Sequence, residues 1–467
     1  MNGNIGKTLN YLKRNGPVET FYAIRERLWE KKKLPPYTYV PVSEEERLRQ
    51  LEDGLSFHTA FSILVPAFET PETYLREMID SVREQTYPKW ELIIADASLT
   101  DTVKNIAGSY DDIRIRYVKL PENGGISENT NGGLAFCTGD YTGLLDHDDL
   151  LTVDALYEMA KAIEKAKNEG IKLQALYSDE DKTDSENKDF FEINEKPKFN
   201  LDLILSNNYI CHFLVLETGL LKEMKLRKEF DGAQDHDLIL RTVHTLMERS
   251  GAGYEKEIFH IGKVLYHWRC HDASTAANPK SKSYAYDRGQ EAVADFIRTT
   301  FAKGAEVITE TGRKTPAGCT PAIIVRRTPH MGFFDVEYRP DVFTYRSDIC
   351  AVGGRILDRD GKVAGGAYNE NKKLLFEGLD ERHSGGYLHR AACKMEVPYL
   401  DTECMCFPEE GKDIHQAAKI LKTLKEENSR SCAPLDRRLL SFRFCDIMRE
   451  KGCHFIYDPE MILCRKP

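Results

Sequence analysis

The sequence predicts an α/β fold in which a mostly parallel sheet is covered by helices on both faces. Two observations predict it: short apolar runs alternate with amphipathic helical stretches from residue 61 onward, and polar or acidic residues directly follow several of these runs. Strands that alternate with helices are typical of parallel sheets. Ligands of such sheets bind beyond the carboxyl ends of the strands, so these polar residues are candidates for a site.

The expected elements follow one another at short intervals. The apolar run "FSILV" (61–65) ends at Pro66, and the stretch 70–85 has helical periodicity with Pro71 as its first residue. The segment "NGGISENTNGGLAFCTG" (123–139) is predicted to form a loop, a helix and a terminating glycine. Further strands are predicted at three runs, 90–96, 113–120 and 140–149.

The motif "LLDHDDLL" (144–151) leads an apolar segment straight into Asp146, Asp148 and Asp149. Neighbouring carboxylates repel one another and lose solvation beside a buried strand, and a bound divalent cation would offset both costs. An acidic surface turn is the alternative for this motif alone. Because Asp96 ends another strand of the same parallel sheet, the carboxylates should gather on one edge, which favours a binding site.

Composition narrows the class of protein. Hydrophobic residues make up 41% of the 467 residues and charged residues 30%, as in soluble globular proteins of two or more domains. The net charge of -10 and the pI of about 5.8 argue against a nucleic-acid partner. No run approaches the roughly 20 apolar residues of a membrane span, and the N-terminus lacks the apolar region of a signal peptide, so a cytoplasmic location is expected.

The 12 cysteines lie mostly after residue 318, and none form a C-x-x-C pair. A secreted disulfide framework is normally a short chain with an export signal, so we expect reduced thiols that pack as small buried hydrophobes. A zinc site at Cys404 and Cys406 is disfavoured by their spacing.

Residues 1–33 are basic and amphipathic, with eight Lys or Arg against three Glu. Phe21, Ile24 and Leu28 share one helical face, with Tyr22 and Trp29 beside it. A helix of this kind either lies on an anionic membrane surface or docks on the body of the protein.

Several motifs together resemble family 2 glycosyltransferases of the GT-A fold. They are "SILVPAFETPETYLREMIDSVREQTYPKWELIIADAS", "NGGISENTNGGL" and "LLDHDD" in a nucleotide-binding half, followed by "FDGAQDHDLILR" (230–241) and "VLYHWRCHDAST" (264–275) in an acceptor half. The resemblance covers about residues 61–318 and is specific because the motifs agree in type and order. Similar bacterial enzymes assemble cell-surface polysaccharides, and some of them are rhamnosyltransferases.

The resemblance implies roles for the residues of the nucleotide-binding half. Asp146 and Asp148 would hold Mg²⁺ or Mn²⁺ against the donor diphosphate, with Asp149 beside them. His271 would approach the same diphosphate or metal, or else it is a histidine of a surface loop. The remaining positions expected around the UDP or dTDP of the donor are Pro66, Phe68, Glu69, Asp96, Asn123, Gly125 and Asn131.

In the acceptor half, the family has a general base as the first Asp of an acidic pair. Here the pair reads Gln234-Asp235, so the resemblance assigns the base to Asp235, with Asp237 as the fallback. Both carboxylates could instead be favourable charges at a helix start. Asp179 and Asp181 of "YSDEDK" (177–182), together with Trp268, are expected on the acceptor side, with a second cation site or a solvated turn as the alternatives for this motif. The segment "SNNYICHF" (206–213) is expected to line the acceptor pocket, unless Cys211 and His212 are core residues.

The C-terminal third resembles the acceptor half of a second, degenerate glycosyltransferase module. "DHDLILRTV" followed by "HIGKVLYHWR" is echoed by "FRFCDIMRE" followed by "YDPEMILCR". Where similar enzymes have an Asp-x-Asp pair, this chain has Ser441-Phe442-Arg443, so this part is predicted to lack catalysis. It would hold the acceptor glycan, support a homo-oligomer or cover the first domain.

The sequence therefore predicts three parts: a basic helical segment with a linker (1–55), a GT-A domain (56–318) and a degenerate glycosyltransferase-like α/β domain (319–467). The expected activity is metal-assisted, inverting transfer from a nucleotide sugar to a glycan or lipid-linked glycan at the inner face of the plasma membrane. A nucleotidyltransferase is the first alternative, disfavoured because "PAFETPET" is not a basic, glycine-rich phosphate loop. A non-catalytic glycan-binding or scaffold protein is the second.

Overall fold

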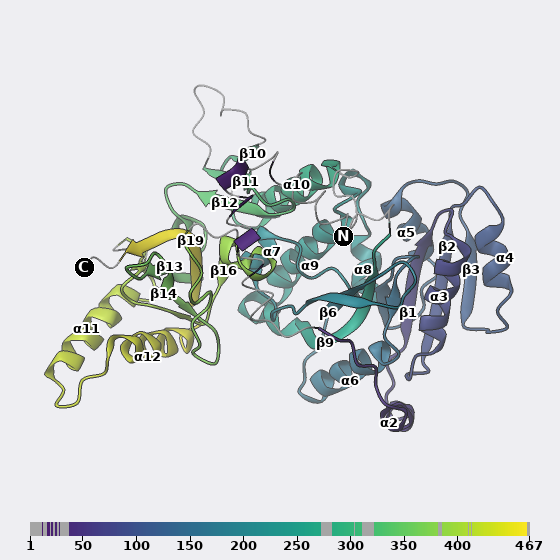
Figure 1. Ribbon diagram of the computed structural model, residues 1–467, viewed down its shortest axis with the longest axis horizontal. Coiled ribbons are helices and arrows are strands. Elements are labelled where there is room, and N and C mark those ends of the chain that lie inside the picture. Colours follow the sequence, from purple (N-terminus) through teal and green to yellow (C-terminus); the bar gives the residue numbers. More distant parts are fainter. Residues whose placement is uncertain are drawn as a thin grey trace. The chain divides into compact units, whose positions relative to one another are not determined.

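The computed structural model describes residues 37–271, 283–302, 304–310, 322–381, 385–409, 411 and 413–464, together with positions 12, 16–18, 20, 21, 24, 25 and 28. The chain forms two compact units (Figure 1). The large-sheet unit comprises Tyr37–Phe199 and Asn208–Phe296. The C-terminal unit comprises Met1–Pro36, Asn200–Asn207 and Ile297–Pro467.

A nine-stranded mixed sheet is the centre of the large-sheet unit. Strands β1, β2, β3 and β4 are mutually parallel neighbours, and β8 runs antiparallel between β4 and β6. The α/β prediction is thus confirmed, with a parallel half and a mixed half. The strand order is β3 (Ile115–Lys119), β2 (Trp90–Asp96), β1 (Phe61–Ala67), β4 (Tyr141–Leu144), β8 (Leu214–Glu217), β6 (Ala175–Thr183), β9 (Ile258–Arg269) and β5 (Leu150–Leu151), with β7 (Phe190–Asn194) on β6.

Helices pack against this sheet through apolar stripes. In α3 (Glu72–Arg83), Leu75, Met78, Ile79 and Val82 recur at helical spacing and are all buried. This helix begins at Glu72, one residue later than expected, because Pro71 occupies the N-cap position. The other described helices of the unit are α2 (Glu44–Gly54), α4 (Thr102–Gly108), α5 (Ile126–Leu134), α6 (Ala155–Asn168), α8 (Thr218–Met224), η1 (Lys228–Phe230), α9 (Gln234–Ser250) and η2 (Gly251–Glu257), while α10 (Ser283–Thr300) continues into the C-terminal unit.

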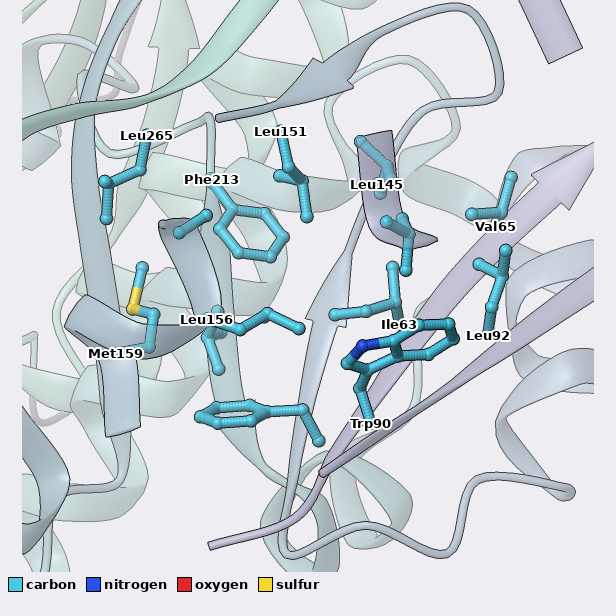
Figure 2. Close-up of a cluster of buried hydrophobic side chains, with 14 of the residues drawn as sticks. Ile63, Val65, Trp90, Leu92, Leu145, Leu151, Leu156, Met159, Phe213 and Leu265 are labelled. Atoms are coloured by element: carbon cyan, nitrogen blue, oxygen red, sulfur yellow. The ribbon is translucent and has the colours of Figure 1, made fainter. Parts of the chain in front are cut away.

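The main core cluster lies on one face of the large sheet (Figure 2). Ile63 of β1 and Leu92 of β2 pack there with Leu156 of α6. Leu145 and Phe213, which lie next in sequence to Asp146 and His212, belong to the same cluster. The backbone beside these two polar residues is therefore anchored by buried apolar side chains.

The strand register places the ends of the parallel strands at one edge. Ala67 of β1 pairs with Asp96 of β2, and Leu64 of β1 pairs with Leu144 of β4. The segments after these strands, including the acidic turn 145–149, therefore leave the sheet on the same side.

The C-terminal unit contains three smaller sheets. The first has the order β10 (Val307–Glu310), β11 (Ile323–Arg327) and β12 (Phe334–Tyr338). The second is β14 (Val363–Gly365), β13 (Ile349–Leu357), β19 (His454–Cys464) and β16 (Met395–Glu396), with β18 (Met405–Cys406) on β13. The third pairs β15 (Ala367–Tyr368) with β17 (Tyr399–Leu400), and the helices are α7 (Leu201–Ser206), η3 (Val342–Thr344), η4 (Tyr387–Ala392), α11 (Ala417–Arg430) and α12 (Arg437–Arg449).

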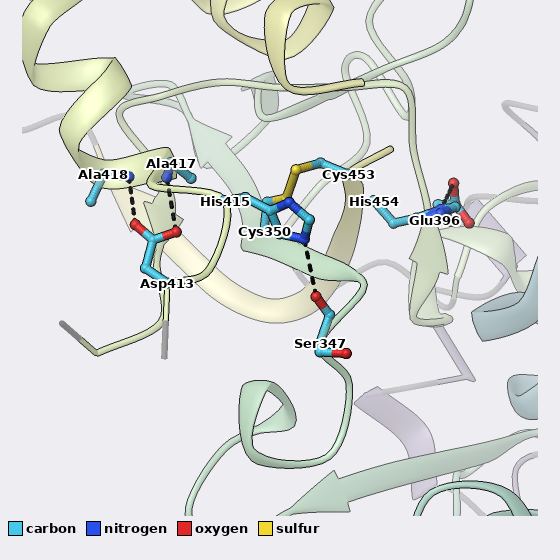
Figure 3. Close-up of a disulfide and its surroundings, with 9 residues drawn as sticks. All are labelled: Ser347, Cys350, Glu396, Asp413, His415, Ala417, Ala418, Cys453 and His454. Carbon is cyan, nitrogen blue, oxygen red and sulfur yellow. Dashed lines mark hydrogen bonds and ion pairs between the residues drawn. A yellow bond between two sulfur atoms is a disulfide. The ribbon is translucent and has the colours of Figure 1, made fainter. Parts of the chain in front are cut away.

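A disulfide joins Cys350 to Cys453 in this unit (Figure 3). The expectation of reduced thiols is wrong for this pair, while the other nine described cysteines are free. Ile349 of β13 pairs with His454 of β19, so the register brings two cysteines 103 residues apart next to each other. Spacing along the chain gives no indication of such a pair.

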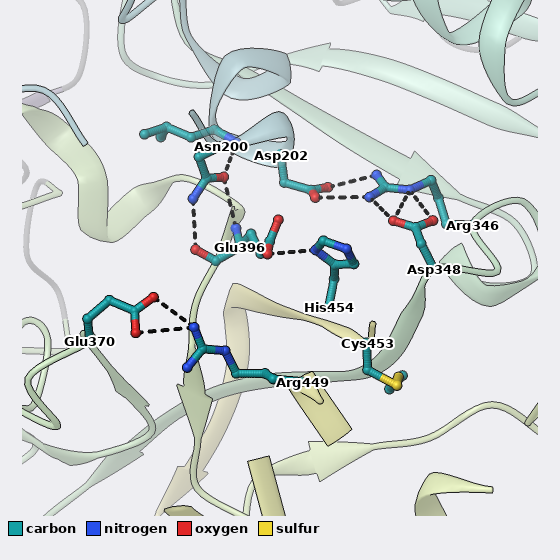
Figure 4. A network of polar contacts seen from close by, with 11 residues as sticks. Asn200, Asp202, Arg346, Asp348, Glu370, Glu396, Arg449, Cys453 and His454 are labelled. Atoms are coloured by element: carbon teal, nitrogen blue, oxygen red, sulfur yellow. Dashed lines mark hydrogen bonds and ion pairs between the residues drawn. A yellow bond between two sulfur atoms is a disulfide. The ribbon is translucent and has the colours of Figure 1, made fainter. Parts of the chain in front are cut away.

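A buried ion-pair network fixes the segment 200–207 within the C-terminal unit (Figure 4). Arg346 exposes 1% of its side chain and pairs with Asp202 at 3.4 Å and Asp348 at 2.6 Å. The Asn200 side chain also donates to and accepts from the backbone of Glu396. These contacts explain why a short piece of chain between two elements of the large sheet belongs to this unit.

Of the N-terminal segment, the described positions are helical, and Phe21, Ile24 and Leu28 are exposed. Arg25 forms an ion pair with Asp380 of the same unit at 2.6 Å. Tyr22 and Trp29 lie outside the described residues. Among the residues that the structure describes, no helix is both long and apolar enough to cross a membrane.

Replacing Arg346 by Met should destabilise the C-terminal unit, because Asp202 would stay buried without its cation. Breaking a buried ion pair costs about 3–5 kcal/mol, measured here by chemical denaturation followed by circular dichroism. Arg437→Met, which breaks the exposed pair with Glu403, is the matched control and should cost less than about 1 kcal/mol. Equal, small losses in both variants would contradict a stabilising role for the buried network.

Candidate active site

The acidic turn after β4 is anchored by its last carboxyl. Asp149 is 1% exposed and accepts hydrogen bonds from the Tyr266 hydroxyl and, at 2.8 Å, from the backbone N–H of Arg269. Burial, followed by repulsion from Asp148 and Asp146, raises the pKa of Asp149 well above its usual range. Asp149 therefore joins the turn to β9 and leaves the other two carboxylates at the surface of the site.

Asp148 and His271 are brought together from distant parts of the sequence. Nε2 of His271 lies 2.7 Å from Oδ2 of Asp148, and the His271 ring lies 5.3 Å from that of Tyr74. The Arg269 side chain donates to the Asp148 carbonyl at 2.6 Å, which fixes the backbone of the turn. The end of the "CHDAST" motif, from residue 272 onward, lies outside the described residues.

Asp146 points toward a different imidazole. About half of its side chain (51%) is exposed, and its Oδ2 lies 3.9 Å from Nε2 of His212. The ligand atoms of Asp146, Asp148 and His271, all described, do not lie within 4.8 Å of one another as one group. The predicted metal ligands thus share the turn and its surroundings but are not gathered around one point.

Asp235 lies in the first turn of α9, and its carboxyl interacts electrostatically with Asp146 of the acidic turn. Nε2 of Gln234 donates to Oδ2 of Asp235 at 3.0 Å, and Oε1 of the same side chain accepts from the N–H of Gly232 at 2.8 Å. Burial, followed by repulsion from Asp146, raises the pKa of Asp235 to about 6, although His212 lowers it. This carboxyl therefore changes protonation near neutral pH, where a general base is most effective.

Asp237 has a different environment although it is only two residues away. It is 1% exposed and forms ion pairs with Arg227 and, at 2.9 Å, with Arg241. Two guanidinium groups occupy its oxygens, so it joins α9 to the segment before it. Of the two candidate bases, Asp235 has a raised pKa and interacts electrostatically with Asp146 of the acidic turn, whereas Asp237 is held by two guanidinium groups.

The nucleotide-side residues surround the ends of β1 and β2. Asp96 is fully buried and accepts from the Tyr117 hydroxyl at 2.7 Å and the Ser98 N–H at 2.8 Å. Glu69 accepts from the N–H of Leu99 at 2.6 Å, so the two strand-end loops are tied together. Phe68 between them is 42% exposed, whereas Pro66 is buried within β1.

The loop before α5 is shaped by its own side chains. The Asn123 side chain accepts from the N–H of Gly125, and Asn131 pairs through its amide with both backbone groups of Leu226. Gly125 has φ +96°, and a Cβ there would lie 2.3 Å from the Asp231 carboxylate. The sequence predicted this loop and helix, but not that Asp231 would lie against the glycine.

The three carboxylates of "YSDEDK" point to opposite faces of β6. Asp179 pairs with His260 at 2.7 Å, and Asp181 accepts from Tyr37 at 2.6 Å and contacts His267. Glu180 lies instead beside His212, whose ring is 5.5 Å from that of the predicted acceptor-side Trp268. Sequence reasoning missed Glu180, although the period of a strand indicates that Glu180 faces away from its two acidic neighbours. It placed His212 only within the segment 206–213, as part of the acceptor pocket or of the core.

Comparisons with known proteins cover the part of the chain that carries the acidic turn. Residues 62–225 match the family model described as Glycosyl transferase family 2, so the chain contains a domain of that family. An uncharacterized protein, y4gI, of Sinorhizobium fredii is 36% identical over 267 residues, which cover 56% of this chain and 28% of that protein. The O-antigen biosynthesis protein RfbC of Myxococcus xanthus is 35% identical over 250 residues, which cover 52% of this chain and 18% of that protein.

The chain thus spans less than a third of the length of these two relatives. A solved structure, S. aureus TarS 1–349 in complex with UDP-GlcNAc, is 16% identical, with a TM-score of 0.38 over 52% of this chain and 73% of that one.

Proposed function

We propose that this chain, which carries a family 2 glycosyltransferase domain, transfers a sugar from a UDP- or dTDP-sugar to a hydroxyl of a growing bacterial surface glycan. The observation that carries the proposal is the pairing of an acidic turn at the sheet edge with Asp235, a carboxyl whose pKa is raised to about 6. The name of the M. xanthus relative, O-antigen biosynthesis protein RfbC, supports a glycan or lipid-linked glycan as the acceptor.

Asp146, Asp148 and His271 would hold the divalent cation, Mg²⁺ or Mn²⁺. Two carboxylates and an imidazole are donors that suit Mn²⁺, and carboxylates alone suit Mg²⁺. The exposed Asp146 side chain can turn toward the pair formed by Asp148 and His271, whereas Asp149 is fixed by Tyr266. When bound, the cation neutralises the negative charge that develops on the departing diphosphate.

Asp235 would take the proton from the acceptor hydroxyl as that oxygen attacks the anomeric carbon. Attack on the face opposite the diphosphate inverts the configuration, so one base is enough and no covalent intermediate is required. A pKa near neutral lets Asp235 be ionised in the resting enzyme and still accept a proton. Trp268 would line the acceptor side on the face of β9 that also faces His212.

The edge formed by β1 and β2 would bind the nucleoside. Phe68 is exposed for contact with the base, and Asp96 lies at the end of β2, where it could accept from a pyrimidine imide. In the present structure, the Tyr117 hydroxyl donates to Oδ2 of Asp96. The nucleotide would therefore have to share this carboxylate with Tyr117.

Nucleotide binding should depend on the metal through the acidic turn. With Mn²⁺ present, Asp146→Ala or Asp148→Ala should weaken UDP or dTDP binding at least about tenfold in calorimetry, because an uncompensated diphosphate would face the remaining carboxylates. The melting temperature should change little, since neither side chain is part of the core. Equal affinity of the wild type in EDTA and in Mn²⁺ would remove the metal assignment.

Asp235→Asn should lower the transfer rate by about 10² to 10⁴ while donor binding persists. In the wild type, kcat/KM should fall as the pH drops below about 6, because protonation of Asp235 removes the base. If Asp235 had the ordinary pKa of an aspartate, kcat/KM would stay unchanged down to a lower pH.

Asp237→Asn is the comparison: it should reduce stability by breaking the pairs with Arg227 and Arg241 and keep the turnover of the folded enzyme. A larger loss of turnover for Asp237→Asn would move the base to that residue.

The N-terminal segment is proposed to contact anionic membranes at the cytoplasmic face. Its basic residues would each add about 1 kcal/mol of attraction, and its exposed apolar face would enter the interface. Changing Phe21, Ile24 and Leu28 together to Asp should lower sedimentation with phosphatidylserine vesicles at least about tenfold. Val40→Asp, at a site 79% exposed outside the segment, should leave sedimentation unchanged. Equal sedimentation of all three proteins would reject membrane contact through this face.

A further inference from the structure

His212 lies beside the acidic turn, and none of the roles proposed above includes it. Its Nε2 is 3.9 Å from Oδ2 of Asp146, and its charge acts on the carboxyl of Asp235. Only 19% of its side chain is exposed. A polar ring this buried beside the site requires a reason for its position.

The ring is held by contacts on two sides. It stacks on Tyr266 with centroids 4.9 Å apart and an interplanar angle of 10°. On its other side, Oε2 of Glu180 accepts from the His212 backbone N–H at 2.5 Å and lies 3.4 Å from Nδ1. Tyr266 also donates to Asp149, so the same side chain supports both the imidazole and the acidic turn.

Glu180 is itself held by buried partners. The ammonium group of Lys196, whose side chain is fully buried, lies 3.1 Å from Glu180, and Asn194 donates to its other oxygen at 3.0 Å. Removing two charges from water is costly, so a buried pair like this one is weak evidence for stability alone. What the pair does provide is a fixed acceptor next to Nδ1, which leaves Nε2 as the ring atom directed at Asp146.

The distance between Nε2 and Asp146 is significant in this setting. At 3.9 Å it is too long for a hydrogen bond, but a hydroxyl oxygen between the two groups can bond to both. In the proposed reaction, the diphosphate lies at the acidic turn and the acceptor hydroxyl lies at Asp235. The transferred sugar must lie between them, because its anomeric carbon joins the bond that breaks to the bond that forms.

We propose that His212 recognises the transferred sugar, through a hydrogen bond between its Nε2 and a sugar hydroxyl that Asp146 also contacts. The inference rests on the proposed function and makes His212 a specificity-determining residue for the donor sugar. It holds for either protonation state of the ring, because a hydroxyl can donate or accept. Lys196 and Glu180 then act as positioning residues for the imidazole.

The test compares the binding of the sugar with that of the nucleotide, without an acceptor. Calorimetry with Mn²⁺ would measure the affinities of the wild type and of His212→Phe for UDP, for dTDP and for a panel of UDP- and dTDP-hexoses. Phe keeps the stacking on Tyr266 and removes both nitrogens. Loss of one hydrogen bond should weaken binding of the preferred nucleotide sugar about fivefold, while binding of its free nucleoside diphosphate changes less than about twofold.

His260→Phe is the matched control, because His260 stacks on Tyr177 at 5.0 Å and pairs with Asp179 on the opposite face of β6. It should leave both affinities unchanged, and His212→Gln, whose amide can replace Nε2, should recover part of the sugar affinity. An unchanged ratio of the two affinities in His212→Phe would overturn the inference, as would an equal change in His260→Phe. If the wild type binds no nucleotide or nucleotide sugar at all, the proposed function itself fails.

Discussion

The site depends on the attachment of the acidic turn to β9. Asp149, through its two hydrogen bonds with Tyr266 and Arg269, helps to hold three neighbouring carboxyl groups in one conformation against their repulsion. Burial, followed by repulsion from Asp148 and Asp146, raises the pKa of Asp149 well above its usual range, which favours its neutral form. Arg269 adds a second attachment through the Asp148 carbonyl and an ion pair with Glu77 at 2.6 Å. Asp146 and Asp148 are therefore presented by a turn whose backbone is fixed at both ends.

Two carboxyl groups that interact with His212 have different environments and different pKa values. Glu180 is fully ionised: burial would raise its pKa, but Lys196 and His212 hold the pKa at about 2. Asp235 lies at the other extreme, since burial and Asp146 raise its pKa to about 6. Carboxylates close to one another thus differ in protonation, which is the arrangement that lets one of them anchor a side chain while another exchanges a proton.

Features that depend on local patterns could be predicted from the sequence, whereas features that depend on contacts between distant segments could not. The parallel strands and the shared edge came from local patterns, and they place Asp96, Asp146 and Asp148 correctly at strand ends. The insertion of β8 between β4 and β6, and with it the place of His212, depends on pairing between segments about 70 and about 40 residues apart, for which no local pattern exists. The network of Asp202 with Arg346 and the disulfide of Cys350 with Cys453 are likewise set by tertiary packing across more than 100 residues.

The C-terminal unit repeats the order of elements that surrounds the proposed base. Helix α9 precedes β9, which runs parallel to β6, and α12 precedes β19, which runs parallel to β13. At the position that the sequence echo aligns with the acidic residues of α9, α12 carries Ser441, which is fully buried. Its hydroxyl donates to the Arg437 carbonyl and accepts from the N–H of Thr402. A side chain with both hydrogen-bonding roles filled inside the unit serves packing, so Ser441 does not take the role that is proposed for Asp235.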